Sequence, residues 1–271
     1  MHLAAATLLQ GNNMEKNFKY IYGPVSSWRL GSSLGIDQLS QEKKICSFDC
    51  VYCQVGRTGI FTCERSIYVP AESIIEELKQ LPDLEIDYYT FSGRGEPTLA
   101  KDFKEVANWI KQVKKGKCAI LTNSTTISDE SVKQDLCVMD LVSFKIDAAN
   151  QKTFEIVNRP CCGIKLENIL NHIADFKKMY KGCFTIQVMA IQENVKEMVQ
   201  IAEICKKLSP DIVYLNTPLR DSPVAPISET SFKEVEKLFE GMRCISVYSA
   251  HKKAVKPISM KDTMRRRGKK I

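Results

Sequence analysis

Apolar and polar residues follow two patterns along this chain, which together predict short strands separated by amphipathic helices. The predicted strands are mostly rich in Val, Ile, Phe and Tyr and are bounded by Gly, Asn, Asp or Pro. They cover residues 30–39, 87–93, 117–123, 140–147, 183–191, 211–217 and 243–249. Apolar residues at helical spacing predict helices over residues 71–81, 102–115, 197–208 and 229–242.

The alternation of strands and helices predicts an α/β fold in which helices pack over a parallel sheet. About six such units suit a partial (β/α)6-type TIM barrel, and a doubly wound open sheet is the alternative. The pattern shows no internal domain boundary. We therefore expect one core domain over residues 20–250, preceded by a poorly ordered extension at 1–19 and followed by a basic tail at 251–271.

Composition restricts the class of protein. The 271 residues are 44% hydrophobic and 26% charged, which are the proportions of a globular protein and exclude a disordered chain. The sequence contains no apolar run of the roughly 20 residues that span a bilayer, so a membrane-spanning protein is excluded as well.

The positive charge is concentrated at the C-terminal end. Residues 252–271 contain nine Lys or Arg and one acid, a net charge of +8, and subtracting this from the total of +7 leaves about −1 for the preceding residues. A basic segment of this kind contacts nucleic-acid phosphates without regard to sequence. The tail therefore predicts either an RNA substrate or a solubilising end.

The chain has eleven cysteines, a high number for its length. The sequence shows no secretory signal, so we expect a reduced, cytoplasmic compartment in which closely spaced cysteines bind metals or clusters. Cys46, Cys50 and Cys53 follow the first predicted strand at C-x3-C-x2-C spacing. In a barrel this loop lies at the C-terminal rim, where active sites are built.

Three thiolates on one loop suit a 4Fe–4S cluster whose fourth iron stays open to a ligand, because fully protein-bound clusters usually take four thiolates. Tyr52 and Phe48 would shield such a cluster from water. A closed structural zinc or iron–sulfur site with Cys63 as the fourth ligand is the alternative. A separate auxiliary site at Cys63, Cys161 and Cys162 is a further alternative.

The cysteine loop resembles that of the radical S-adenosylmethionine (SAM) superfamily. Further segments resemble the superfamily's wyosine-synthase-like branch, which modifies a guanosine of phenylalanine tRNA: YGPVSSWRLGSSLGID (22–37), CVYCQVGRT (50–58), FSGRGEPTL (91–99), LTN (121–123), VNRP (157–160) and LNTP (215–218). The resemblance covers most of the chain, from Tyr20 to Tyr248.

The resemblance implies two cofactors, a 4Fe–4S cluster bound by the three cysteines and SAM. The reduced cluster cleaves SAM to methionine and a 5′-deoxyadenosyl radical, which abstracts hydrogen from a substrate, and the electron comes from a flavodoxin- or ferredoxin-type donor. By the same resemblance, the glycines and carboxylate of one strand end hold the SAM amino group, and polar residues at the other strand ends contact the rest of SAM. These predicted SAM contacts are Gly93, Gly95, Glu96, Asn123, Asp147, Gln187 and Asn216.

Lys145 is the candidate catalytic residue. It lies two residues before Asp147, so in a strand both side chains point to the same face. A desolvated lysine there would form a Schiff base with a keto substrate, as wyosine synthases do with pyruvate, and the alternative is an ion-paired structural lysine.

The chain also departs from the wyosine synthases. It has no cysteine before Cys46, so the second cluster of the archaeal enzymes cannot form in the same way. We therefore predict a radical SAM enzyme with a tRNA base as the leading substrate. The alternatives are a radical SAM enzyme acting on a small molecule or peptide, and a non-catalytic iron–sulfur or zinc protein.

Overall fold

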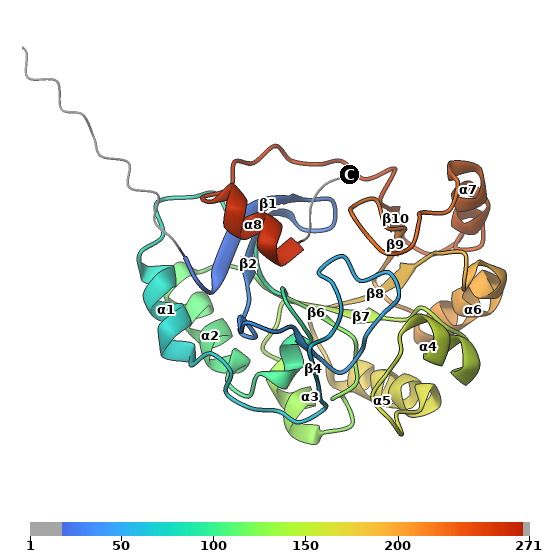
Figure 1. Ribbon diagram of the computed structural model, residues 1–271, viewed down its shortest axis with the longest axis horizontal. Helices are drawn as coiled ribbons and strands as arrows, with labels where there is room; N and C mark the ends of the chain where they lie inside the picture. Colours follow the sequence, from blue (N-terminus) through green and yellow to red (C-terminus); the bar gives the residue numbers. More distant parts are fainter. Residues whose placement is uncertain (1–17, 268–271) are drawn as a thin grey trace, which may run out of the picture.

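The computed structural model describes residues 18–267 and is built on one eight-stranded sheet that curls into an open barrel (Figure 1). The strand order is β1-β2-β5-β6-β7-β8-β9-β10; β1 is antiparallel to β2, and each later neighbour pairs in parallel. The strands are β1 (Ile21–Ser27), β2 (Gly31–Ile36), β5 (Tyr88–Phe91), β6 (Cys118–Thr122), β7 (Leu141–Lys145), β8 (Cys183–Met189), β9 (Ile212–Asn216) and β10 (Cys244–Ser246).

Helices follow the parallel strands in turn and cover the outside of the curled sheet (Figure 1). This arrangement confirms the predicted α/β partial barrel. The helices are α1 (Ala71–Lys79), α2 (Phe103–Trp109), which continues as a π turn over Ile110–Lys114, α3 (Glu130–Leu136), α4 (Gln151–Val157), α5 (Leu166–Met179), α6 (Met198–Leu208) and α7 (Glu229–Lys237). None of the helices within residues 18–267 is both long enough and apolar enough to cross a membrane.

The two faces of the sheet differ in chemistry because successive strand residues point to opposite sides. The outer face forms the main apolar core with the helices; for example, the rings of Phe144 on β7 and Phe176 on α5 meet edge to face at 5.4 Å. A separate small cluster of Leu30, Ala119 and Leu141 fills the inner face at the start of the strands. The helices therefore stabilise the outer face, and the polar residues nearer the strand ends line the inside.

The sequence pattern missed several elements. The hairpin strand β1 and the helices α3, α4 and α5 were not among the predicted elements. Helix α5 buries Leu166, Ile169, Ile173 and Phe176, so its helical spacing was present in the sequence. The predicted strands also extend beyond the observed ones, because the loops that follow a barrel strand keep apolar residues where they pack against the site.

The C-terminal segment contains a helix, α8 (Met260–Arg267), which packs on β1 (Figure 1). Arg266 is only 3% exposed, and its Nε lies 3.5 Å from Oδ2 of Asp37, which is 2% exposed. A second bond runs from its Nη2 to the main-chain oxygen of Lys19. The expectation of a solvated tail is therefore wrong for this helix. Residues 268–271 and most of the predicted extension at 1–19 lie outside the described residues.

The buried pair leads to a prediction about pH. Burial raises the pKa of Asp37 from 3.8 to about 6, and the charge of Arg266 offsets only part of this rise. The folded protein thus holds the Asp37 proton more tightly than the unfolded chain does, so ionising Asp37 lowers the free energy of unfolding. This loss of stability is absent below about pH 4 and complete above about pH 6. Asp37→Asn does not ionise, so it should gain stability relative to the wild type as the pH rises. We expect the difference between the two unfolding free energies to grow by roughly 3 kcal/mol across this window.

The measurement is urea unfolding of both proteins at several pH values. A difference that stays constant from about pH 4 to about pH 7 would show that Asp37 ionises in the folded protein as it does in the unfolded chain.

Candidate iron–sulfur site

The cysteine loop connects β2 to α1 and crosses the C-terminal ends of the parallel strands (Figure 1). Two short parallel strands, β3 (Ile45–Cys46) and β4 (Ile60–Phe61), close its base. Inside the loop, the N–H of Cys53 donates to the oxygen of Cys50 at 3.0 Å. The N–H of Val51 donates to the oxygen of Val157, after β7, at 2.9 Å. The loop is therefore held both by its own turns and by the barrel.

Each of the three thiols has a side-chain hydrogen-bond donor. Nζ of Lys44 lies 3.1 Å from the sulfur of Cys53. Nδ2 of Asn123, at the end of β6, lies 3.7 Å from the sulfur of Cys46, and Nδ2 of Asn158 lies 3.6 Å from that of Cys50. Donors aimed at sulfur stabilise thiolate and are one of the means by which proteins adjust iron–sulfur clusters.

The electrostatics of the thiols show what the site requires. Burial raises the pKa of Cys46 well above the ordinary thiol value, and it raises the pKa of Cys50 to about 11, with neighbouring Cys53 adding to the rise. Thiolates therefore need a positive partner here, and bound iron supplies one. The donor set fits a 4Fe–4S cluster with one iron free of protein. Within residues 18–267 no group of three or more His, Cys, Asp or Glu side chains is placed to hold a single metal ion.

Tyr52 fixes the loop to the barrel through a buried polar cluster. Its hydroxyl donates to Oδ2 of Asp147, which also accepts a bond from Asn158 at 2.9 Å. Oδ1 of Asp147 accepts the N–H of Met189 at 2.8 Å. Asp147 thus lies at the predicted strand end, but protein groups occupy its carboxylate, and its side chain is fully buried. The ring of Tyr52 packs against Val157 and Met189, beside Cys50.

Glu96 connects the second strand end to the third. Its Oε1 accepts the hydroxyls of Thr98 and Thr122, each at 2.6 Å, and its Oε2 accepts the N–H of Asn123 at 2.6 Å. Burial raises the pKa of this carboxyl, and these bonds partly offset the rise. Glu96 therefore orients Asn123, the residue that reaches Cys46, and its remaining lone pair is on Oε2.

The two glycines of this segment allow close packing of the chain on itself. A Cβ on Gly93 would lie 2.5 Å from the carboxyl carbon of Asp37, and one on Gly95 would lie 1.7 Å from the oxygen of Ile45. Both have φ near +150°, at +146° and +149°. The resemblance implies that both glycines contact SAM; the atoms nearest to each glycine in the structure belong to Asp37, Leu39 and Ile45.

Other predicted residues line the inner face of the sheet. Lys145 pairs in register with Gln187, and Met189 pairs with Asn216. Nζ of Lys145 lies 3.5 Å from Oδ2 of Asp147 and 4.8 Å from the ring centre of Tyr52, so the predicted common face and the ion pair are both present. The amides of Gln187 and Asn216 have no hydrogen-bond partner within residues 18–267, which leaves both available to a ligand.

Cys63 has a different thiol neighbour, Cys161. Its thiol acts on Cys161, whose pKa is raised to about 12, first by burial and then by Cys63. Cys162 also acts on Cys161 and is exposed. The contacts of Cys63 therefore favour the open three-cysteine site over the closed site in which Cys63 is the fourth ligand.

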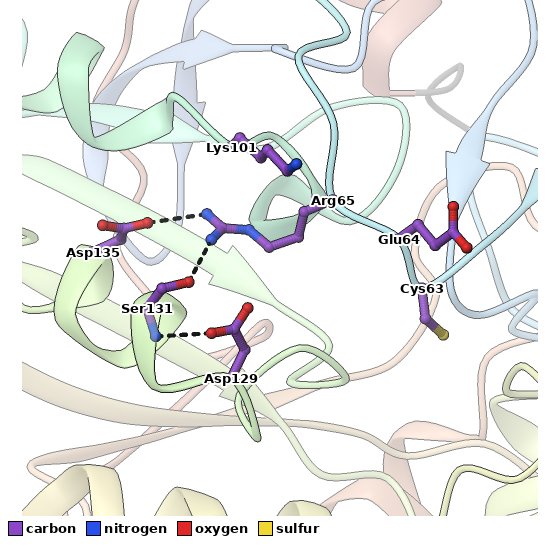
Figure 2. A pocket seen from close by; sticks show the side chains of 7 residues that line it. All are labelled: Cys63, Glu64, Arg65, Lys101, Asp129, Ser131 and Asp135. Carbon is purple, nitrogen blue, oxygen red and sulfur yellow. Dashed lines mark hydrogen bonds and ion pairs between the residues drawn. The ribbon is translucent and has the colours of Figure 1, made fainter.

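A cavity of about 640 Å³ opens between Cys63 and residues of helix α3 (Figure 2). In it Arg65 is bound by Asp135 at 3.0 Å and by Ser131 at 3.0 Å, and Cys63 points away from this group (Figure 2). The charged side chains at its centre are already paired with one another. We therefore place the functional site at the cysteine loop and not in this cavity.

Sequence reasoning missed two residues of the site. Lys44 precedes the motif by two positions, and its proximity to Cys46 was a usable local signal. Asn158 stands in the VNRP segment that supported the family resemblance, but its contact with Cys50 joins residues 108 positions apart. A contact of that range follows from the barrel's closure and is invisible in a sequence pattern.

Comparisons with known proteins agree with this geometry. A family model described as the Radical SAM superfamily matches residues 44–205. The UPF0026 protein slr1464 of Synechocystis sp. is 38% identical over 213 residues, 78% of this chain and 80% of that protein. A probable GTP 3′,8-cyclase of Saccharolobus islandicus is 22% identical over 198 residues, 72% of this chain and 60% of that one.

Among solved structures, Streptococcus suis SuiB bound to S-adenosylmethionine matches with a TM-score of 0.59 at 14% identity. The match covers 75% of this chain and 48% of SuiB, so this chain spans about half the length of that protein. At this identity the likeness concerns the fold.

Proposed function

Since the chain belongs to the radical SAM superfamily, we propose that Cys46, Cys50 and Cys53 bind its 4Fe–4S cluster and that it uses SAM to oxidise or rearrange a substrate. The chain is an enzyme of radical chemistry, and its cofactors are a 4Fe–4S cluster and SAM. When bound and reduced, the cluster would supply the electron that cleaves SAM to methionine and a 5′-deoxyadenosyl radical able to abstract hydrogen from the substrate.

One observation carries the assignment of the ligands: three thiols at the strand ends, each with its own nitrogen donor. Lys44, Asn123 and Asn158 come from three different parts of the chain, so their convergence on the three sulfurs is a property of the fold. Cys50 and Cys53 are partly exposed and Cys46 is buried, which leaves one side of the group open to a second ligand.

The predicted SAM contacts divide into two kinds. The amides of Gln187 and Asn216 are proposed to bind SAM directly, because neither has a hydrogen-bond partner within residues 18–267 and both lie near the strand ends. Glu96, Asp147 and Asn123 are proposed to position the backbone and the cysteine loop, since their polar atoms already bind protein groups. Gly93 and Gly95 are proposed to bring the second strand end close to the cysteine loop.

Lys145 stays a candidate catalytic residue. Its amine is held by Asp147 and lies over the ring of Tyr52, directly beside the cysteine loop. The Schiff-base role requires the amine to leave Asp147 and lose its proton. Holding the loop through Asp147 and Tyr52 requires neither step, and it is the role that the observed contacts favour.

We propose a nucleotide-containing substrate, with a tRNA base as the leading case, as in the wyosine-like branch. Support comes from the similarity to a protein named for a reaction of GTP and from the family segments in the sequence. The buried Arg266 reduces the basic surface available to RNA, so α8 supports this proposal less than the sequence suggested. A small molecule or peptide is the second candidate.

The electron donor is proposed to be a flavodoxin or ferredoxin.

The test is made without oxygen on the reconstituted full chain. Iron and sulfide content is measured first, followed by 5′-deoxyadenosine formed from SAM with dithionite as reductant. Product together with about four irons per chain supports the proposal. A fully loaded cluster that gives no product, and whose spectrum is unchanged by SAM, would show that no iron is open.

Lys44 leads to a prediction about the cluster's reduction potential. Lys44 is 5% exposed and its ammonium lies beside the sulfur of Cys53, so it would stabilise the extra negative charge of the reduced cluster. We expect Lys44→Met to make the potential more negative by on the order of 100 mV. An anaerobic redox titration followed by electron paramagnetic resonance measures the shift. The matched control is Lys43→Met, which removes an exposed lysine and should leave the potential unchanged.

A further inference from the structure

Three arginines gather on the open side of the barrel. The two outermost strands of the sheet are β1 and β10, and the described residues contain no strand that joins them. Arg29 lies in the turn between β1 and β2, Arg220 follows β9, and Arg267 ends α8. Nη1 of Arg220 donates to the oxygen of Arg267, and the hydroxyl of Tyr214 on β9 donates to the oxygen of Arg29 at 3.4 Å. The three residues thus bridge the gap between the two sides of the sheet.

None of the three guanidinium groups has a carboxylate partner within residues 18–267. Nε of Arg29 is buried and has no hydrogen-bond partner there. Burial and then the charge of Arg267 lower the pKa of Arg29 to about 10 and that of Arg220 to about 9, so all three remain charged at neutral pH and repel one another. By contrast, Arg266, the residue before Arg267, is paired with Asp37.

A group of partly buried cations without a compensating acid is unfavourable unless an anion binds among them. A cation that serves only the fold is normally paired within the protein, as Arg266 is. Three partly buried arginines without an acid partner among residues 18–267 are therefore better explained by a ligand that brings the negative charge.

One of the three arginines, Arg220, contacts the cysteine loop directly. Nη2 of Arg220 donates to Oε1 of Gln54, and Nε2 of Gln54 donates back to the oxygen of Arg220 at 3.3 Å. Gln54 directly follows Cys53, and the Cys53 thiol is among the groups that act on the pKa of Arg220. An anion held by the arginines would therefore lie beside the proposed cluster.

We propose that Arg29, Arg220 and Arg267 bind a phosphate-class group of the substrate and so place the substrate's reacting carbon near the cluster. This inference rests on the proposed function and specifies its substrate class as a phosphorylated molecule. A phosphate offers several charged oxygens, which match the forked donors of guanidinium groups better than the single charge of a carboxylate does. The SAM carboxylate is the other source of an anion at this site, and the experiment separates the two.

The experiment titrates inorganic pyrophosphate into the anaerobic, reconstituted full chain by isothermal titration calorimetry at constant ionic strength. The variants are Arg29→Gln and Arg267→Gln, and SAM binding is measured in parallel. We expect the wild type to bind pyrophosphate and each variant to bind it roughly 10- to 100-fold more weakly, because each loses a charged hydrogen-bond donor. SAM affinity should be unchanged in both variants.

The matched control is Arg265→Gln, which removes an exposed arginine from the same helix and should leave pyrophosphate binding unchanged. Arg267→Gln guards against misfolding, because its side chain makes no hydrogen bond or ion pair within residues 18–267. The proposal is overturned if the wild type does not bind pyrophosphate, or if Arg265→Gln weakens binding as much as Arg267→Gln does. It is also overturned if the two variants lose SAM affinity and keep pyrophosphate affinity, which would assign the arginines to the SAM carboxylate.

The proposed function is read separately, from 5′-deoxyadenosine formed by the wild type with SAM and dithionite. Product formation without pyrophosphate binding would overturn the anion site alone. Pyrophosphate binding without product would overturn the radical SAM ligand assignment and leave the anion site standing.

Discussion

We expect Cys50→Ala to abolish both the iron–sulfur absorbance and the formation of 5′-deoxyadenosine, to the level of a protein-free control. Cys50 is one of three thiols proposed to bind the cluster, and a cluster with two protein ligands and two open irons is not retained. Cys63 is not expected to replace it, since its thiol interacts with Cys161. The measurements are iron and sulfide content, the visible spectrum, and chromatography of the SAM products under strictly anaerobic conditions.

The matched control is Cys63→Ser, which removes an exposed thiol outside the three-cysteine group. It should keep the wild-type iron content and product yield. Loss of the cluster in Cys63→Ser would instead identify Cys63 as a fourth ligand, which supports the closed-site alternative. An unchanged cluster in Cys50→Ala would remove this residue from the ligand set.

The cysteine loop could be found from sequence because its information is local. The spacing of Cys46, Cys50 and Cys53 lies within eight residues, and the strand before it places the loop at the rim. The positions of Asn123 and Asp147 at the ends of predicted strands were found in the same way, from the pattern of apolar residues and the turn residues that bound it. Where each polar group would point was not predictable, because Asp147 binds the hydroxyl of Tyr52, 95 residues away.

The C-terminal segment shows the opposite case. A run of three arginines is the usual composition of a solvated tail, and the charge pattern contains no sign of a partner. The partner of Arg266 is Asp37, more than 220 residues earlier, and the pair forms only because the barrel brings α8 onto β1. Arg267 lies in the same run but pairs with no acid among residues 18–267. Two adjacent arginines therefore differ in their partners because of where the tertiary fold places each of them.

The second large effect is expected for Gly95→Ala. Gly95 has φ of +149°, a region that L-residues rarely adopt, and an added Cβ would lie 1.7 Å from the oxygen of Ile45. The N–H of Glu96 donates to that same oxygen at 3.2 Å, so the clash would break the contact between the strand end and the base of the cysteine loop. We expect the free energy of unfolding of the cluster-free protein to fall by about 3 kcal/mol or more, and we expect the variant to lose cluster binding.

Gly163→Ala is the matched control, because Gly163 also has positive φ, +84°, but a Cβ there would have no atom within 4 Å. It carries the backbone cost alone, about 1 kcal/mol, and should retain the cluster. Urea unfolding and iron content of both variants separate backbone strain from the clash at Ile45. Equal losses of stability would show that the contact with Ile45 contributes nothing. A large loss of stability in Gly95→Ala alone would show that the close contact between Gly95 and Ile45 is needed. That contact would then be what holds Glu96 and Asn123 against Cys46.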